Sequence, residues 1–82
     1  MDIEDIREGV LNILQELHED IDFEAVEKMV DDKILDSFDL VTLVTELGEE
    51  FDVDITAKDF IAENFNSVDA LSEMIARLME EA

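Results

Sequence analysis

Apolar residues recur at helical spacing in three long stretches of the chain. Side chains three and four positions apart lie on the same face of an α-helix, so each stretch predicts an amphipathic helix with one buried stripe. We predict these helices over residues 2–17, 37–50 and 68–79. The stripes are Ile3, Ile6, Val10, Ile13, Leu14 and Leu17; Leu40, Leu43, Val44, Leu47 and Phe51; and Val68, Leu71, Met74, Ile75, Leu78 and Met79.

A shorter helix is predicted before the last stripe. Thr56 followed by Asp59 three residues later is typical of a helix start, because the two side chains can cap the first turn. We therefore expect a helix over residues 57–63, with Phe60 and Ile61 on its buried side.

Two connections complete the predicted fold. Residues 64–67 are expected to form a turn in which Asn66 or Ser67 caps the last helix. Residues 19–36 are acidic but contain interspersed apolar residues, so we expect them to pack against the helices, with one helical turn over residues 24–29. The predicted class is all-α: a small four-helix bundle with three main helices, one short third helix and a long loop between the first two.

Charge and composition narrow the classes of function. The 82 residues predict a single domain over residues 1–82. With 25 Asp and Glu residues against five Lys and Arg, the formal net charge is -20. This charge argues against nucleic acid and anionic membrane surfaces as partners and favours proteins with basic docking patches. It also opposes folding, but 48% of the residues are apolar and lie at helical spacing, so a disordered chain is not expected.

Enzymatic chemistry is not expected. The chain has no cysteine, so a thioester on this protein needs a thiol that the chain does not encode, and a thiolate metal site is excluded. The single histidine, His18, lies among acidic residues and is interpreted as a solvated helix-ending residue. No signal peptide or membrane-length apolar run is evident, so we expect a cytoplasmic monomer with no membrane insertion.

Ser37 is the candidate functional residue. It stands at the predicted start of the second helix, directly after Asp36, and either side chain can accept hydrogen bonds from first-turn amides. Those amides and the helix dipole also favour a phosphate ester on the serine hydroxyl, although a serine that only caps the helix is the simpler alternative. The side of the helix away from the buried stripe, with the acidic residues near it, predicts a docking surface of Phe38, Asp39, Val41, Thr42, Thr45 and Glu49.

A family resemblance appears at this point in the chain. Residues 34–44, Ile-Leu-Asp-Ser-Phe-Asp-Leu-Val-Thr-Leu-Val, with Leu47, Glu49, Glu50 and Phe51, resemble the second helix of acyl carrier proteins. The spacing of the flanking helices extends the resemblance over nearly the whole chain. In relatives the residue before Ile34 is commonly glycine, whereas here it is Lys33.

The resemblance implies a function. In acyl carrier proteins the serine of the Asp-Ser-Leu/Phe/Met motif carries 4′-phosphopantetheine, which implies that Ser37, next to Asp36, is the attachment site here. A phosphopantetheinyl transferase would then supply the group from coenzyme A. The thiol of the group would hold an acyl or aminoacyl thioester, and the carrier would present it to a loading ligase and downstream transferases with basic docking patches. The protein itself would be a non-catalytic carrier.

The cargo stays open at this stage. The Phe65-Asn66-Ser67 turn is similar to the aromatic-Asn-Thr/Ser turn that precedes the last helix of D-alanyl carrier proteins. Those proteins usually have Met after the serine and lack the acid that Asp39 supplies, whereas fatty-acid carriers share the acid but not the turn. A fatty-acyl, a D-alanyl or other aminoacyl, or a specialised polyketide or nonribosomal peptide pathway all fit.

Two alternatives come from other classes. Asp52, Asp54, Thr56 and Glu63 occupy positions 1, 3, 5 and 12 of an EF-hand-like calcium loop. The position that needs glycine in such a loop holds Ala57, which counts against calcium binding. The second alternative is a carrier-like adaptor whose serine is never modified.

Overall fold

The protein forms an all-helical fold. The computed structural model describes residues 2–81, and over that range it contains helices and turns but no strand. The helices are α1 (Ile3–Leu17), α2 (Ser37–Phe51), the 3-10 helix η1 (Ala57–Asp59), α3 (Ala62–Phe65) and α4 (Val68–Glu81). The three long helices begin and end close to the predicted residues, within the usual uncertainty of helix ends. The predicted all-α class, with three main helices and a long first loop, is confirmed.

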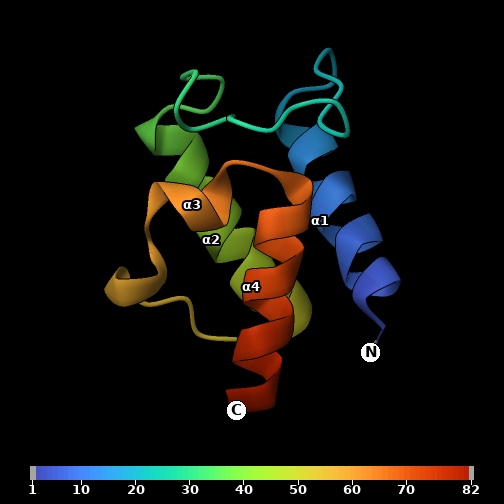
Figure 1. The fold of residues 1–82 in the computed structure, drawn as a ribbon, viewed down its shortest axis with the longest axis vertical. Coiled ribbons are helices and arrows are strands. Elements are labelled where there is room, and N and C mark those ends of the chain that lie inside the picture. The colour runs from blue at the N-terminus through green and yellow to red at the C-terminus, as the bar shows by residue number, and fades with distance from the viewer. Residues whose placement is uncertain (1, 82) are drawn as a thin grey trace.

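Figure 1 shows how the long helices are arranged. α1 runs toward the end of the molecule where residues 19–36 lie, and α2 and α4 run in the opposite direction. α1 packs against α2 and α4, and α3 packs against α4. The start of α2, with Ser37, therefore lies at the end of the bundle that the long connection covers, opposite the two termini (Figure 1).

The predicted stripes supply most of the core. Their buried members are Ile6, Val10, Ile13, Leu14, Leu43, Leu47, Phe51, Val68, Leu71, Met74, Ile75 and Leu78. Ile3 was predicted to be buried, but this is wrong, because it is 47% exposed in the first turn of α1. Leu17, Leu40, Val44 and Met79 are only partly buried but pack against this core.

The long connection belongs to the core as well. Phe23, Met29 and Leu35 are almost completely buried, which confirms that residues 19–36 pack against the helices. The helical turn expected over residues 24–29 is wrong. That part of the connection has only single i to i+3 turn bonds, such as the one from the Val26 amide to the Phe23 carbonyl, and these are not continued into a helix.

Gly9 allows α1 and α2 to approach closely. A Cβ atom at Gly9 would lie 2.7 Å from Cζ of Phe51, which is closer than non-bonded carbon atoms approach. Glycine at this position lowers the stability of α1 by on the order of 1 kcal/mol relative to alanine. It also leaves room for the Phe51 ring from the end of α2 to pack against α1.

The prediction of one continuous helix over residues 57–63 is wrong, because the chain forms η1 and α3 with a break between them. The predicted start is correct, because Thr56 precedes η1 and Oδ2 of Asp59 accepts both the amide and the hydroxyl of Thr56, at 3.3 and 3.2 Å. The Asp59 carbonyl then accepts the Ile61 amide at 2.9 Å, and Phe60 has φ −86° and ψ 65°, the geometry of an inverse γ-turn. This turn separates η1 from α3 and leaves Phe60 and Ile61 46% and 49% exposed, although both were expected to be buried.

The turn before α4 is shorter than expected. Asn64 and Phe65 belong to α3, and Phe65 is buried, so only Asn66 and Ser67 form the turn. Of the two predicted caps, Asn66 and Ser67, the cap is Ser67, because its Oγ accepts a hydrogen bond from the Ala70 amide at 3.0 Å.

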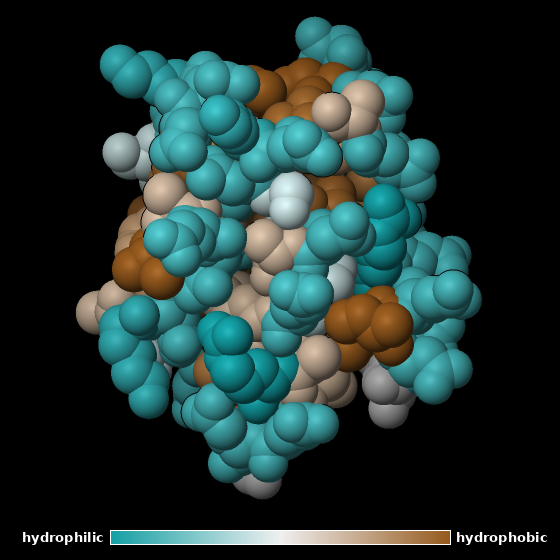
Figure 2. Space-filling view, viewed as in Figure 1, coloured by the Kyte–Doolittle hydropathy of each residue, from teal (hydrophilic) through white to brown (hydrophobic). Residues whose placement is uncertain are grey.

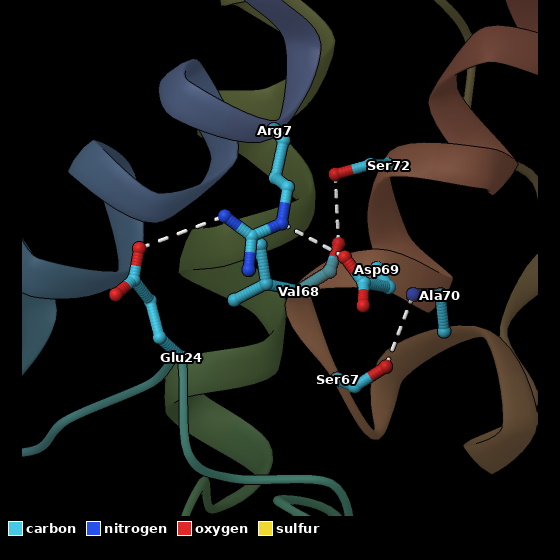
Figure 3. A network of polar contacts seen from close by, with 7 residues as sticks. All are labelled: Arg7, Glu24, Ser67, Val68, Asp69, Ala70 and Ser72. Carbon is cyan, nitrogen blue, oxygen red and sulfur yellow. Dashed lines mark hydrogen bonds and ion pairs between the residues drawn. The ribbon is translucent and has the colours of Figure 1, made fainter. Parts of the chain in front are cut away.

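Arg7 places a positive charge between two acidic segments. Its Nε donates to Oδ1 of Asp69 on α4 at 2.8 Å, and its guanidinium lies 3.6 Å from Oε1 of Glu24 in the long connection (Figure 3). In a protein with a net charge of -20, this contact ties three elements together at a point where their carboxylates would otherwise repel one another.

The surface is dominated by polar side chains. Figure 2 shows one face that is largely hydrophilic, with hydrophobic residues in small separate patches. Among residues 2–81, no helix has the length and apolarity needed to cross a membrane.

Candidate functional site

Ser37 is the first residue of α2, and its side chain is exposed. The residue that caps the helix is Asp36, whose Oδ1 accepts the Asp39 amide at 2.8 Å. Oδ2 of Asp39 in turn accepts the Asp36 amide at 3.4 Å, which completes a reciprocal capping box. The structure thus decides between the two predicted caps, and within residues 2–81 the Ser37 hydroxyl has no side-chain partner. It lies at the positive end of a 15-residue helix dipole.

The capping box is held from the side by α1. His18, the residue at which α1 ends, donates from Nε2 to Oδ2 of Asp39 at 2.8 Å. The His18 side chain is 32% exposed and that of Asp39 only 16%. The expectation of a solvated histidine is therefore wrong, although the expected helix-ending position is correct. The hydrogen bond from His18, followed by those within the capping box, holds the pKa of Asp39 below its ordinary value of 3.8.

The turn before Ser37 has unusual backbone geometry. Lys33 has φ 59°, in the left-handed region that normally favours glycine. Lys33 therefore adopts the backbone conformation that the glycine common at this position in relatives would adopt easily. Two amides after this turn, those of Ile34 and Leu35, both donate to the carbonyl of Met29, at 2.9 and 3.2 Å. The turn thus closes on itself immediately before the helix begins.

Two small apolar pockets lie beside α2. One, of about 180 Å³, is lined by Val41, Val44 and Thr45 of α2 and by residues 55–57 and Phe60. The other, of about 130 Å³, is lined by Val30, Leu40, Phe60, Ile61, Ala62 and Phe65. Phe60 contributes to both, and its ring packs edge-on against Phe65 with 5.1 Å between ring centroids.

Comparison with known proteins bears on this geometry. A family described as the phosphopantetheine attachment site matches residues 34–75, which include all of α2 and α3 and part of α4. The chain is similar to D-alanyl carrier proteins of Streptococcus suis (strain 05ZYH33), Streptococcus mutans serotype c and Lactobacillus acidophilus, at 32%, 33% and 30% identity. These matches cover 92%, 90% and 94% of this chain and 96%, 95% and 99% of the relatives.

The chain belongs to the acyl carrier protein family. It is a carrier of 4′-phosphopantetheine, and the prediction made from the Asp-Ser-Phe motif and the helix that follows it is confirmed at this level. The family match includes the motif and the whole of α2.

The predicted docking residues of the carrier form one side of α2. Phe38 and Val41 are 78% and 61% exposed, and Glu49 is also exposed. The hydroxyls of Thr42 and Thr45 donate to the carbonyls of Phe38 and Val41, at 3.1 and 2.9 Å, so they are bonded within the helix. Asp39 differs from the rest, because its carboxylate is already bonded to His18 and to the Asp36 amide.

Sequence reasoning missed several residues around the site. Phe60 and Ile61 extend the apolar surface beside α2 because of the inverse γ-turn. No residue pattern in the chain predicted this turn. His18 reaches Asp39 only because α1 ends beside the start of α2. Asn66 was singled out as a possible cap of α4, but its contact with the long connection was not predicted.

The calcium hypothesis is not supported by the carrier's geometry. It required residues 52–63 to form one ligand loop, whereas η1 and α3 begin within that range. The hydroxyl of Thr56 and the carboxylate of Asp59 are bonded to each other at 3.2 Å. Over residues 2–81, no group of three or more His, Asp or Glu side chains is placed to hold a metal ion.

The pKa of Asp39 provides a test of the link between α1 and the capping box. We expect the NMR-detected titration of its carboxyl carbon to give a value below 3.8 in the parent protein and a higher one in His18→Ala, which removes the largest cause of the shift. Because the folded-state pKa is lowered, this link stabilises the fold above the ordinary pKa of Asp and stops doing so as the pH falls through the folded-state value. Identical titrations in the two proteins would mean that His18 does not hold Asp39 in solution.

Proposed function

We propose that Ser37 is the residue to which 4′-phosphopantetheine is attached. The observation that carries the proposal is the exposed Ser37 at the N-terminus of α2, directly after a helix cap in which Asp36 and Asp39 take part and the Ser37 hydroxyl does not. The Ser37 hydroxyl is not used to cap the helix, so it is available to a transferase. The helix dipole favours the negative charge of the phosphodiester at this position.

The chain's own residues would do little chemistry at this site. During transfer the Oγ–H bond of Ser37 breaks and an Oγ–P bond forms, while coenzyme A releases adenosine 3′,5′-bisphosphate and the proton goes to a base of the transferase. Within residues 2–81, the Ser37 hydroxyl is hydrogen-bonded to no histidine, and His18 is bonded to Asp39 instead. When attached, the group supplies the thiol that a chain without cysteine lacks. Ser37 is thus an acceptor, and the protein a non-catalytic carrier.

We infer that the cargo is a small aminoacyl group, with D-alanyl the first candidate. Relatives that cover at least 90% of this chain are D-alanyl carrier proteins. The pockets of about 180 and 130 Å³ beside α2 are smaller than the roughly 300–1,000 Å³ of sites that enclose drug-sized ligands. They suit a short acyl group better than a long hydrocarbon chain.

The exposed side of α2 is the proposed docking surface for partner enzymes. It presents Phe38 and Val41 next to Ser37, and Glu49 two turns further along the helix. Together with a net charge of -20, this arrangement fits a partner that has a basic patch around an apolar recess. Steered, weak docking of this kind allows rapid encounter with successive enzymes and rapid release.

Intact mass spectrometry tests the attachment site. The apo protein is incubated with coenzyme A, magnesium and a broad-specificity phosphopantetheinyl transferase, beside Ser37→Ala. We expect the parent protein to gain one phosphopantetheine and Ser37→Ala to gain none, with the same helical circular dichroism spectrum for both. If the parent gains nothing under conditions that modify a control carrier, the unmodified-adaptor hypothesis takes its place.

Loading of the modified protein tests the cargo. We expect the holo protein to gain one alanyl group when it is incubated with D-alanine, ATP and a D-alanine–carrier ligase, and to lose it on treatment with hydroxylamine, which cleaves thioesters. A parallel reaction with a long-chain fatty acid and an acyl–carrier synthetase is the control. Efficient fatty-acyl loading without alanyl loading would contradict the aminoacyl assignment while leaving Ser37 as the attachment site.

A charge reversal on α2 tests the docking surface. Glu49→Lys should raise the KM of the transferase for the carrier roughly several-fold while leaving kcat nearly unchanged, because a basic partner loses a favourable contact and gains a repulsive one. Glu80→Lys on α4 makes the same change in net charge at an exposed position outside that surface. Equal effects of the two variants would show that net charge, rather than the α2 surface, determines docking.

A further inference from the structure

A single residue of the α3–α4 turn is bonded to the long connection through both its backbone and its side chain. The carbonyl of Asn66 accepts the Met29 amide at 2.8 Å. Its Oδ1 accepts the amides of Val30 and Asp31, at 3.0 and 3.1 Å, and its Nδ2 donates to Oδ2 of Asp31 at 3.1 Å. Three consecutive residues of the connection are therefore held by Asn66, and we call these four hydrogen bonds the Asn66 clamp.

The clamp is joined to Ser37 by a short series of backbone hydrogen bonds. Met29 is bonded on both sides: its amide donates to Asn66, and its carbonyl accepts the amides of Ile34 and Leu35. Leu35 directly precedes the capping residue of α2, and both Met29 and Leu35 are buried. Hydrogen bonds and buried side chains therefore link the clamp to the residue before the cap.

Apart from its buried side chains, the connection is held by few regular backbone hydrogen bonds. Residues 19–36 contain no helix or strand, so their backbone groups depend on turns and on side chains for hydrogen bonds. On the opposite side, the His18–Asp39 bond fixes the first turn of α2 relative to α1. The Asn66 clamp is the corresponding link to the α3–α4 turn, so the start of α2 is held between the two.

The clamp also fixes one of the pockets beside α2. The pocket of about 130 Å³ is lined by Val30, whose amide donates to Asn66, and by Phe65, which directly precedes Asn66 in the chain. A shift of the connection relative to α3 would therefore change the shape of this pocket and the position of Ser37 together.

We propose that Asn66 is a positioning residue for Ser37. It couples the acceptor serine to the α3–α4 turn, so that the transferase meets Ser37 in one defined position. The proposal rests on Ser37 being the attachment site, as inferred above. It assigns separate roles to three consecutive residues: Phe65 packs in the core, Ser67 caps α4, and Asn66 bonds residues 29–31 of the connection that leads to Ser37.

The test compares two variants of the same turn in the chain of residues 1–82. Asn66→Ala removes the three side-chain hydrogen bonds of the clamp, whereas Ser67→Ala removes the cap of α4 and leaves the clamp intact. Steady-state transfer of phosphopantetheine from coenzyme A is measured well below the melting temperature of each protein. We expect Asn66→Ala to lose roughly tenfold in kcat, since misplacement of a reacting group is costly, and Ser67→Ala to keep the parent value at equal or lower stability.

Amide hydrogen exchange reports the positioning without any enzyme. In Asn66→Ala the amides of Ile34 and Leu35, which donate to Met29, should exchange faster relative to the core amides of α1. In Ser67→Ala their exchange should follow global stability only.

A swap of donor and acceptor provides the rescue. Asn66→Asp alone places a second carboxylate against Asp31 and should reduce kcat. The double variant Asn66→Asp/Asp31→Asn restores a donor opposite an acceptor and permits all three side-chain hydrogen bonds again, so it should recover most of the parent kcat. This pair of variants also carries the comparison if Asn66→Ala does not fold.

The outcomes separate this proposal from the attachment site itself. If the parent protein is modified at Ser37 but Asn66→Ala reacts at the parent rate, or loses no more than Ser67→Ala, Asn66 has no positioning role. The same conclusion follows if the double variant folds but gains nothing over Asn66→Asp. If the parent is not modified at all, the attachment proposal fails, and unchanged exchange of Ile34 and Leu35 in Asn66→Ala would then overturn the clamp independently.

Discussion

Burial of apolar side chains against a strong self-repulsion is the constraint on which this structure depends. The net charge of -20 favours expansion, and the basic residues are too few to offset it by pairing. Each helix therefore turns its apolar stripe inward, and the long connection adds Phe23, Met29 and Leu35 to the same core. The contacts of Arg7 with Glu24 and Asp69 join acidic segments that would otherwise repel one another. The connection is thus part of the core rather than a linker.

The site follows from the same constraint. With the connection packed down, the first turn of α2 is held from two sides: His18 bonds Asp39, and Asn66 bonds the residues that lead to the helix. Asp36 provides the cap, which leaves Ser37 exposed and free of a structural duty in the described chain. An exposed serine next to a separate helix cap supports the proposed attachment at Ser37.

Much of the fold was predictable because it depends on local periodicity. Three long helices, the cap pair at Thr56 and a helix start at Asp36 or Ser37 were visible in the local sequence, since amphipathic stripes and helix starts are determined by residues within one or two turns. The motif around Ser37 was equally local, and it identified the family. The break between η1 and α3 was not predictable, because the carbonyl of Asp59 bonds the Ile61 amide and the Asn64 side chain instead of continuing a helix. This choice exposes Phe60 and Ile61 beside α2.

By itself the sequence determined the all-α class, the three main helices, the acidic surface and the candidate serine, because each of these depends on neighbouring residues or on composition. Only the tertiary structure decided which residues hold that serine. His18 and Asp39 are 21 residues apart, and Asn66 and Val30 are 36 apart, so their contacts exist only after the core has brought the segments together. No spacing rule within one helix encodes such pairs. The chain's chemistry is therefore local, whereas the placement of that chemistry depends on the packed fold.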